Sequence, residues 1–104
     1  EVIDLYLADT PRILDEAQRA LARHDAAALA ASAHALKGSI GLFARTGAYD
    51  EARRLESSAR AGEWAGIEET FTRLSVEAKL LSEELQALSR LAVDEALGEL
   101  LQGV

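Results

Sequence analysis

Residues 67–88, IEETFTRLSVEAKLLSEELQAL, hold the most regular pattern in the chain. Apolar residues recur there at alternating spacings of four and three, which is the period of one face of an α-helix. The members of this stripe are Ile67, Phe71, Leu74, Ala78, Leu81, Leu85 and Leu88. The pattern predicts a long amphipathic helix that buries one face against other elements.

The N-terminal part of the chain is expected to hold two helices. A short amphipathic segment comes first, on Val2, Leu5 and Tyr6. It is expected to stop before Thr10, which can cap a second helix. Pro11 suits the first position of that helix, because the N–H that proline lacks has no helical partner there. The apolar spacing extends the second helix as far as Arg23.

Two further helices are expected before the long C-terminal stripe. Asp25 can cap a helix that begins at Ala26 and ends at Phe43 or Ala44. The next helix is expected to end near Gly62, because glycine adopts the left-handed backbone of a helix end without steric cost.

Helical stripes joined by short loops favour antiparallel neighbours in a bundle. The expected fold is therefore all-α, an up-and-down antiparallel four-helix bundle with a short additional N-terminal helix. We assign the bundle to residues 1–92. Residues 93–104 carry three acidic and no basic side chains. They are expected to form an acidic amphipathic tail, an extra helical turn or a frayed end.

The composition of the chain excludes several classes of function. Its 104 residues suit a single domain, and a net charge of −7 has the wrong sign for holding nucleic acid. The absence of cysteine rules out disulfides and thiolate metal sites, and it fits a reducing, cytoplasmic location. No apolar run approaches the length of about 20 residues that a membrane span needs. Because the chain starts at Glu1, we expect a segment of a longer polypeptide or a trimmed protein.

His34 is the residue on which chemistry is most plausible. On a helical wheel it lies roughly 140° from the buried stripe of its helix, on the solvent side. Its neighbours along that face are small apart from one lysine: Ala30, Ala31, Lys37, Gly38 and Gly41. Each glycine costs up to about 1 kcal/mol of helix stability relative to alanine. The clearing favours close approach of another protein to the imidazole, with these small residues and Arg45 as docking positions.

Lys37 lies one turn from His34 on the same side of the helix, where its ammonium can lie beside an anion attached to the ring. Imidazole is a nucleophile at neutral pH and can carry a transferred group covalently. Between His34 and Arg60 there are five basic and three acidic residues, a local charge of +2. This local charge favours encounter with an acidic pocket on a partner.

The segment Ala33-His34-Ala35-Leu36-Lys37-Gly38-Ser39, followed by Leu55-Glu56, resembles the signature of histidine-containing phosphotransfer (HPt) domains of multistep two-component phosphorelays. The resemblance extends from about residue 5 to residue 88. It implies that His34 accepts a phosphoryl group from a receiver-domain aspartyl phosphate and passes it to another receiver. It also implies that Lys37 stabilises the phosphorylated form and that Gly38 lets the receiver dock. Ala44 departs from the family pattern, which usually has glycine there.

The resemblance also implies a division of labour with the partner. The chain has no nucleotide-binding loop and no kinase signature. We therefore expect a phosphoryl carrier with no cofactor of its own, with Mg²⁺ supplied by the response-regulator receiver domain. The chain is expected to be a monomer and can belong to a hybrid sensor kinase.

Two other hypotheses remain from the residues alone. The first is a helical interaction or dimerisation module in which His34 is incidental, and the long C-terminal stripe supports it. The second is a kinase-type dimerisation domain, which the residues around His34 do not favour. Of the remaining residues, Glu56 is expected to be solvated or ion-paired, His24 to be a cap or a surface residue, and Trp64 and Phe71 to belong to the core.

Overall fold

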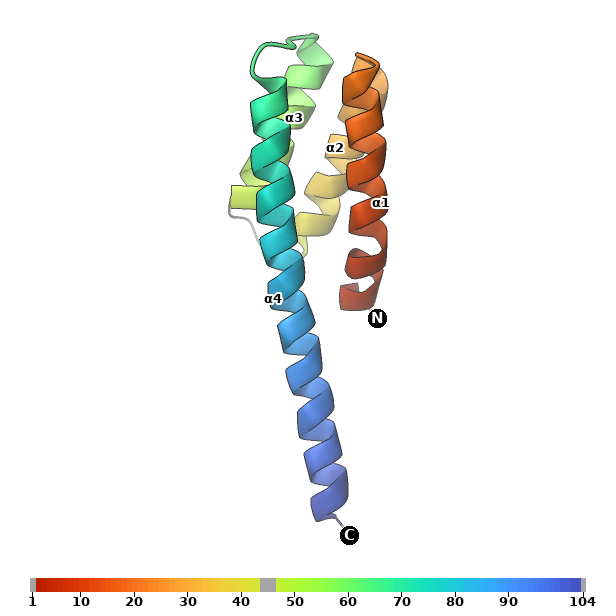
Figure 1. Cartoon of the computed structure of the whole chain (residues 1–104), viewed down its shortest axis with the longest axis vertical. Helices are drawn as coiled ribbons and strands as arrows, with labels where there is room; N and C mark the ends of the chain where they lie inside the picture. The colour runs from red at the N-terminus through yellow and green to blue at the C-terminus, as the bar shows by residue number, and fades with distance from the viewer. Residues whose placement is uncertain (1, 44–46, 104) are drawn as a thin grey trace.

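The computed structural model describes residues 2–43 and 47–103, and every regular element in these ranges is a helix. The helices are α1 (Val2–Ala22), α2 (Ala26–Gly41), α3 (Gly47–Ala61) and α4 (Ile67–Gln102). Successive helices alternate in direction, each packs on the next, and α1 also packs on α4 (Figure 1). The prediction of an all-α, up-and-down four-helix bundle is confirmed.

The predicted break near Thr10 and Pro11 is wrong, because α1 is continuous through both residues. A proline inside a helix removes one backbone hydrogen bond and costs about 3 kcal/mol or more. Burial on both sides of the proline offsets this cost, since one buried stripe, apolar except for Thr10, runs along the whole helix. The buried members of the stripe are Tyr6, Thr10, Ile13, Ala17 and Ala20. Pro11 itself is exposed, on the opposite side of the helix.

The ends of the short helices match the capping residues in the sequence. The Asp25 side chain accepts a hydrogen bond from the Ala28 N–H at 3.1 Å, as expected of a cap at the start of α2. Gly62 follows α3 with a φ of +68°, in the left-handed region that favours glycine. Both predicted boundaries are confirmed, and α2 ends at Gly41, two or three residues before the expected end at Phe43 or Ala44.

The α2–α3 pair forms the most extensive helix contact in the bundle. Small side chains such as Ala33, Ala52 and Ala59 are buried along these two helices, together with Leu36 and Leu55. Alanine lets helix backbones approach closely, and the leucines fill the space that remains. This contact fixes the register of α2 against α3, on which the site described below depends.

A buried carboxylate also ties α3 to α4. Glu51 accepts a hydrogen bond from Arg73 Nε at 3.1 Å across the α3–α4 contact and one from Arg54 Nη1 at 3.2 Å within α3. Both contacts are made to the same oxygen of Glu51, Oε1. The pairing adds an electrostatic link between the two helices.

The helix α4 is much longer than the bundle and projects from it (Figure 1). Its buried residues end at Leu85, whereas Leu88, Leu91 and Leu97 are each more than half exposed. The helix runs unbroken to Gln102, so residues 93–102 are helical rather than frayed. The division of the chain at residue 92 stays a prediction. None of the helices in the described ranges combines the length and apolarity that crossing a bilayer requires.

Candidate functional site

His34 lies in the middle of α2 and points toward solvent beside α3, with 64% of its side chain exposed. Its Nδ1 atom lies 3.0 Å from Oε2 of Glu56 on α3. The exposure predicted from the helical wheel is confirmed. The contact with Glu56 was not predicted from the sequence, because the two residues are 22 positions apart and lie on different helices.

Glu56 is the centre of this site and is almost fully buried, with only 5% of its side chain exposed. Its Oε1 atom lies 2.9 Å from Nζ of Lys37, and its Oε2 atom also pairs with Nη2 of Arg60, one turn along α3. The expected ion pairing of Glu56 is confirmed, but its part in the site was missed. Glu56 and Arg60 are four residues apart on one helix, so the sequence spacing is enough to predict their ion pair. The contacts with His34 and Lys37 come from the register of α2 on α3.

The Glu56 carboxylate is held in its charged form. Burial raises its pKa, but the hydrogen bonds from Lys37 and His34 and the charges of Lys37 and Arg60 outweigh burial, so the pKa is lowered overall. A buried carboxylate is tolerated only when cations and hydrogen bonds replace its hydration. The site therefore presents a fixed negative charge to the inner nitrogen of the His34 ring.

This charge assigns the tautomer of the His34 ring. An ionised carboxylate can only accept hydrogen bonds, so Nδ1 of His34 donates its proton to Glu56. The lone pair of a neutral imidazole then lies on Nε2. None of the described residues makes a hydrogen bond to Nε2. The nucleophilic atom is thus directed away from Glu56, on a ring that solvent reaches.

Gly38 leaves the space beside the ring open, as expected. A Cβ atom built at this position would meet nothing within 4 Å, so the glycine is not required by packing inside the domain. Ala31, one turn before His34, is exposed as well. These two residues leave a low surface beside the imidazole.

Two other expected docking positions, Ala30 and Gly41, do not line this surface. Ala30 is 8% exposed and belongs to the hydrophobic core, so its predicted exposure is wrong. Gly41 is half-buried, and a Cβ there would lie 3.2 Å from the ring of Tyr49, so this glycine makes room for α3. The direction of a helical face cannot reveal which neighbouring helix fills it. Arg45 and Ala44 lie outside the described residues.

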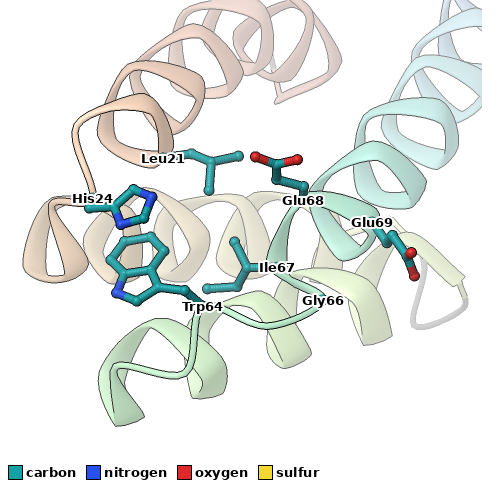
Figure 2. A pocket seen from close by; sticks show the side chains of 7 residues that line it. All are labelled: Leu21, His24, Trp64, Gly66, Ile67, Glu68 and Glu69. Carbon is teal, nitrogen blue, oxygen red and sulfur yellow. The ribbon is translucent and has the colours of Figure 1, made fainter.

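The bundle holds a second exposed imidazole, His24, at the end where α1 meets α2. His24 has a left-handed backbone with a φ of 52°. Its ring stacks on Trp64, with the centroids 4.3 Å apart and the planes at 16° (Figure 2). Trp64 precedes α4 in the connecting loop and is half-buried against the core. The expectation of a surface histidine is confirmed, and its stacking on Trp64 was not foreseen.

The His24–Trp64 stack borders an open hollow of about 320 Å³ that Leu21 and Ile67 line on its inner side (Figure 2). Glu68 and Glu69 of the first turn of α4 complete its edge. Acidic side chains in a first turn are favoured by the helix dipole. No group of three or more potential metal ligands occurs anywhere in the described ranges.

Comparisons with known proteins agree with the geometry. The family model described as Hpt domain matches residues 1–102 of the 104-residue chain. This match reaches well past residue 88 and includes the projecting part of α4. Comparison with the curated proteins and with the solved structures gave no match. The chain therefore belongs to the Hpt domain family, whose members are phosphocarrier modules that act with receiver domains in two-component phosphorelays.

Proposed function

We propose that this chain carries a phosphoryl group on Nε2 of His34. It accepts the group from an aspartyl phosphate of one receiver domain and passes it to the aspartate of another. The observation that carries this proposal is the buried, ionised Glu56 on the inner nitrogen of an exposed imidazole. Exposure admits a large partner, and the carboxylate fixes which nitrogen reacts.

The transfer step balances without a base on this chain. The Nε2 lone pair forms the N–P bond while the P–O bond to the receiver aspartate breaks, and that electron pair returns to the aspartate carboxylate. Nδ1 keeps its proton, so the phosphorylated ring becomes cationic. Glu56 stabilises this new positive charge, because its carboxylate already accepts the Nδ1–H hydrogen bond. In the onward transfer the ring leaves as neutral imidazole.

Lys37 and Gly38 support the same step. The Lys37 ammonium is one turn from His34 and can turn from Glu56 toward a phosphoryl group on the ring. The open space at Gly38 admits the surface of a receiver. Phosphoryl transfer requires mainly alignment and charge stabilisation. We assign Mg²⁺ to the receiver, where it stabilises charge on the transferring group. The same role fits a free-standing carrier and a module of a hybrid sensor kinase.

The proposal is tested by incubating the protein with a receiver that carries ³²P on its aspartate, in the presence of Mg²⁺. The protein should gain acid-labile, alkali-stable label, and ³¹P NMR should place it on Nε2. His34→Gln should take no label, whereas His24→Gln is the matched control and should take label as the wild type does. Label retained by His34→Gln would contradict the proposal.

A second candidate function is helical self-association, which the projecting part of α4 favours. Six large apolar residues there are more than half exposed: Leu88, Leu91, Val93, Leu97, Leu100 and Leu101. Exposed apolar side chains that gather on one element are a feature of protein–protein contact surfaces. Sedimentation equilibrium of the wild type and of Leu97→Glu tests this function, and a wild type that stays monomeric at high micromolar concentration would contradict it.

A further inference from the structure

We infer that Glu56 exchanges one cationic partner for another when His34 is phosphorylated, and that Arg60 is the positioning residue that holds Glu56 throughout the exchange. This inference rests on the proposed function. It concerns four side chains that meet in the α2–α3 contact: His34, Lys37, Glu56 and Arg60.

The two oxygens of Glu56 have different partners in the unphosphorylated protein. Lys37 occupies Oε1 at 2.9 Å, whereas Oε2 is shared by His34 Nδ1 and Arg60 Nη2. The His34 ring is neutral in the reactive tautomer. The buried carboxylate is therefore balanced by two cations, Lys37 and Arg60, and by one neutral hydrogen bond.

The position of Lys37 creates a conflict with its expected role. Its ammonium is bound to Glu56, and only 26% of its side chain is exposed. Stabilising a phosphoryl group on Nε2 requires the ammonium to turn toward that group. If nothing else changed, Glu56 would lose one of its two cations while remaining buried, which is strongly unfavourable.

Phosphorylation itself supplies the missing charge. The ring becomes cationic when Nε2 bonds to phosphorus, and its Nδ1–H already donates to Glu56 Oε2 at 3.0 Å. That neutral hydrogen bond becomes a charge-assisted one, which is shorter and stronger. Glu56 then has the imidazolium and Arg60 as its two cations. Lys37 is released toward the phosphoryl group with little change in the charge balance at Glu56.

Arg60 is suited to be the constant partner. It extends from α3, the helix that carries Glu56, so its contact does not depend on the rearrangement on α2. A guanidinium is a permanent cation in proteins, so this partner is not lost by deprotonation. It contacts neither His34 nor Lys37 through any hydrogen bond or ion pair in the described ranges. Arg60 therefore acts on the reacting ring through Glu56.

The test is a double-mutant cycle on the lifetime of phosphorylated His34. Wild type, Arg60→Gln, Glu56→Gln and the double variant are labelled by a phosphorylated receiver, purified from it, and followed by loss of label at neutral pH. Arg60→Gln should shorten the lifetime about fivefold, and Arg60→Lys should restore most of it. With glutamine at position 56 there is no buried charge to balance. Arg60→Gln should then change the lifetime less than about twofold.

A spectroscopic readout follows the exchange directly. The Lys37 Nζ and Arg60 Nε resonances are recorded by ¹⁵N NMR before and after phosphorylation of the wild type. The Lys37 signal should shift strongly on phosphorylation, whereas the Arg60 signal should stay in place. A Lys37 signal that does not move would overturn the exchange, even if Arg60→Gln failed to fold.

The outcomes separate the inference from the proposed function. An equal effect of Arg60→Gln with glutamate or glutamine at position 56 would show that Arg60 acts directly on the phosphoryl group, and would overturn the inference alone. A wild type that takes no label from any phosphorylated receiver would contradict the proposed function and the inference together.

Discussion

The two histidines of this chain are both exposed on the same small bundle, yet their surroundings differ completely. His34 lies at mid-helix, with its inner nitrogen on the buried carboxylate of Glu56. His24 lies at a helix junction in left-handed backbone, with its ring face on Trp64. Exposure alone therefore does not distinguish the imidazole that we propose as the phosphoacceptor from the other surface histidine. The difference between the two histidines is the charged Glu56 carboxylate, which α3 places against one ring nitrogen of His34.

Of the changes that test this comparison, a substitution on the surface beside His34 should have the largest effect. Gly38→Phe fills the open space next to the ring, and it should slow loading of His34 by a phosphorylated receiver on the order of a hundredfold. Loading by the small donor phosphoramidate should change little, because that donor needs less space. Ala65→Phe, an exposed change beside Trp64, is the control. Equal loss with both donors would mean that Gly38 serves the fold instead of docking.

At the other histidine, Trp64 is expected to matter for stability and not for transfer. Trp64→Ala removes the ring that supports His24 and opens the side of the core, so the free energy of unfolding should fall by about 2 kcal/mol. Urea denaturation measures this change. Loading of His34 should remain within twofold of wild type at a temperature where the variant is folded. A large loss of loading in folded protein would show that the two regions are coupled.

Low pH should reduce the stability of the folded protein, because it protonates the Glu56 carboxylate beside His34. The pKa of Glu56 is lowered in the folded protein, so its contribution is fully present above about pH 4.3, where a free glutamate titrates. The contribution is lost as the pH falls through the lower folded value. Urea denaturation at pH 7 and pH 3 should show wild type losing more stability than Glu56→Gln, by about 1 kcal/mol. The same loss in both proteins would contradict the paired state of Glu56.

The smallest expected effect concerns the backbone of His24. A left-handed conformation costs a residue with a Cβ roughly 1 kcal/mol, and glycine avoids that cost. His24→Gly should therefore be more stable than His24→Ala by about that amount, since both variants lose the Trp64 stack equally. Thermal unfolding of the pair measures the difference. Equal stability would mean that the junction relaxes when the stack is lost.

Local signals in the sequence account for much of the fold. The four-three spacing places the helices, Asp25 and Gly62 mark two of their ends, and the wheel places His34 on the exposed side of α2. Each of these features depends on residues within one or two turns. The predicted break at Pro11 is wrong because the prediction considered the cost of one proline but not the buried residues on either side of it.

The candidate site was only partly accessible to the same reasoning. His34 and Lys37 share a helical face, so their proximity follows from spacing on one helix. Glu56, which contacts both of them, lies on α3 and is buried. Glutamate is usually a solvated surface residue, so the sequence did not indicate that this one is buried. Ala30 and Gly41 are the opposite case: the helical wheel predicts that they are exposed, but the packing of the bundle covers them.

By itself the sequence determined which segments become helices, which face of each is apolar, and which histidine stands in a cleared, lysine-bearing stretch. These properties are periodic and local, and a helix fixes its own side-chain directions at 3.6 residues per turn. The tertiary structure alone decided that Glu56 meets His34, that Arg60 and Lys37 share one carboxylate, and that Trp64 covers His24. Such contacts depend on how far one helix slides along another, and the packing of the whole bundle sets that distance.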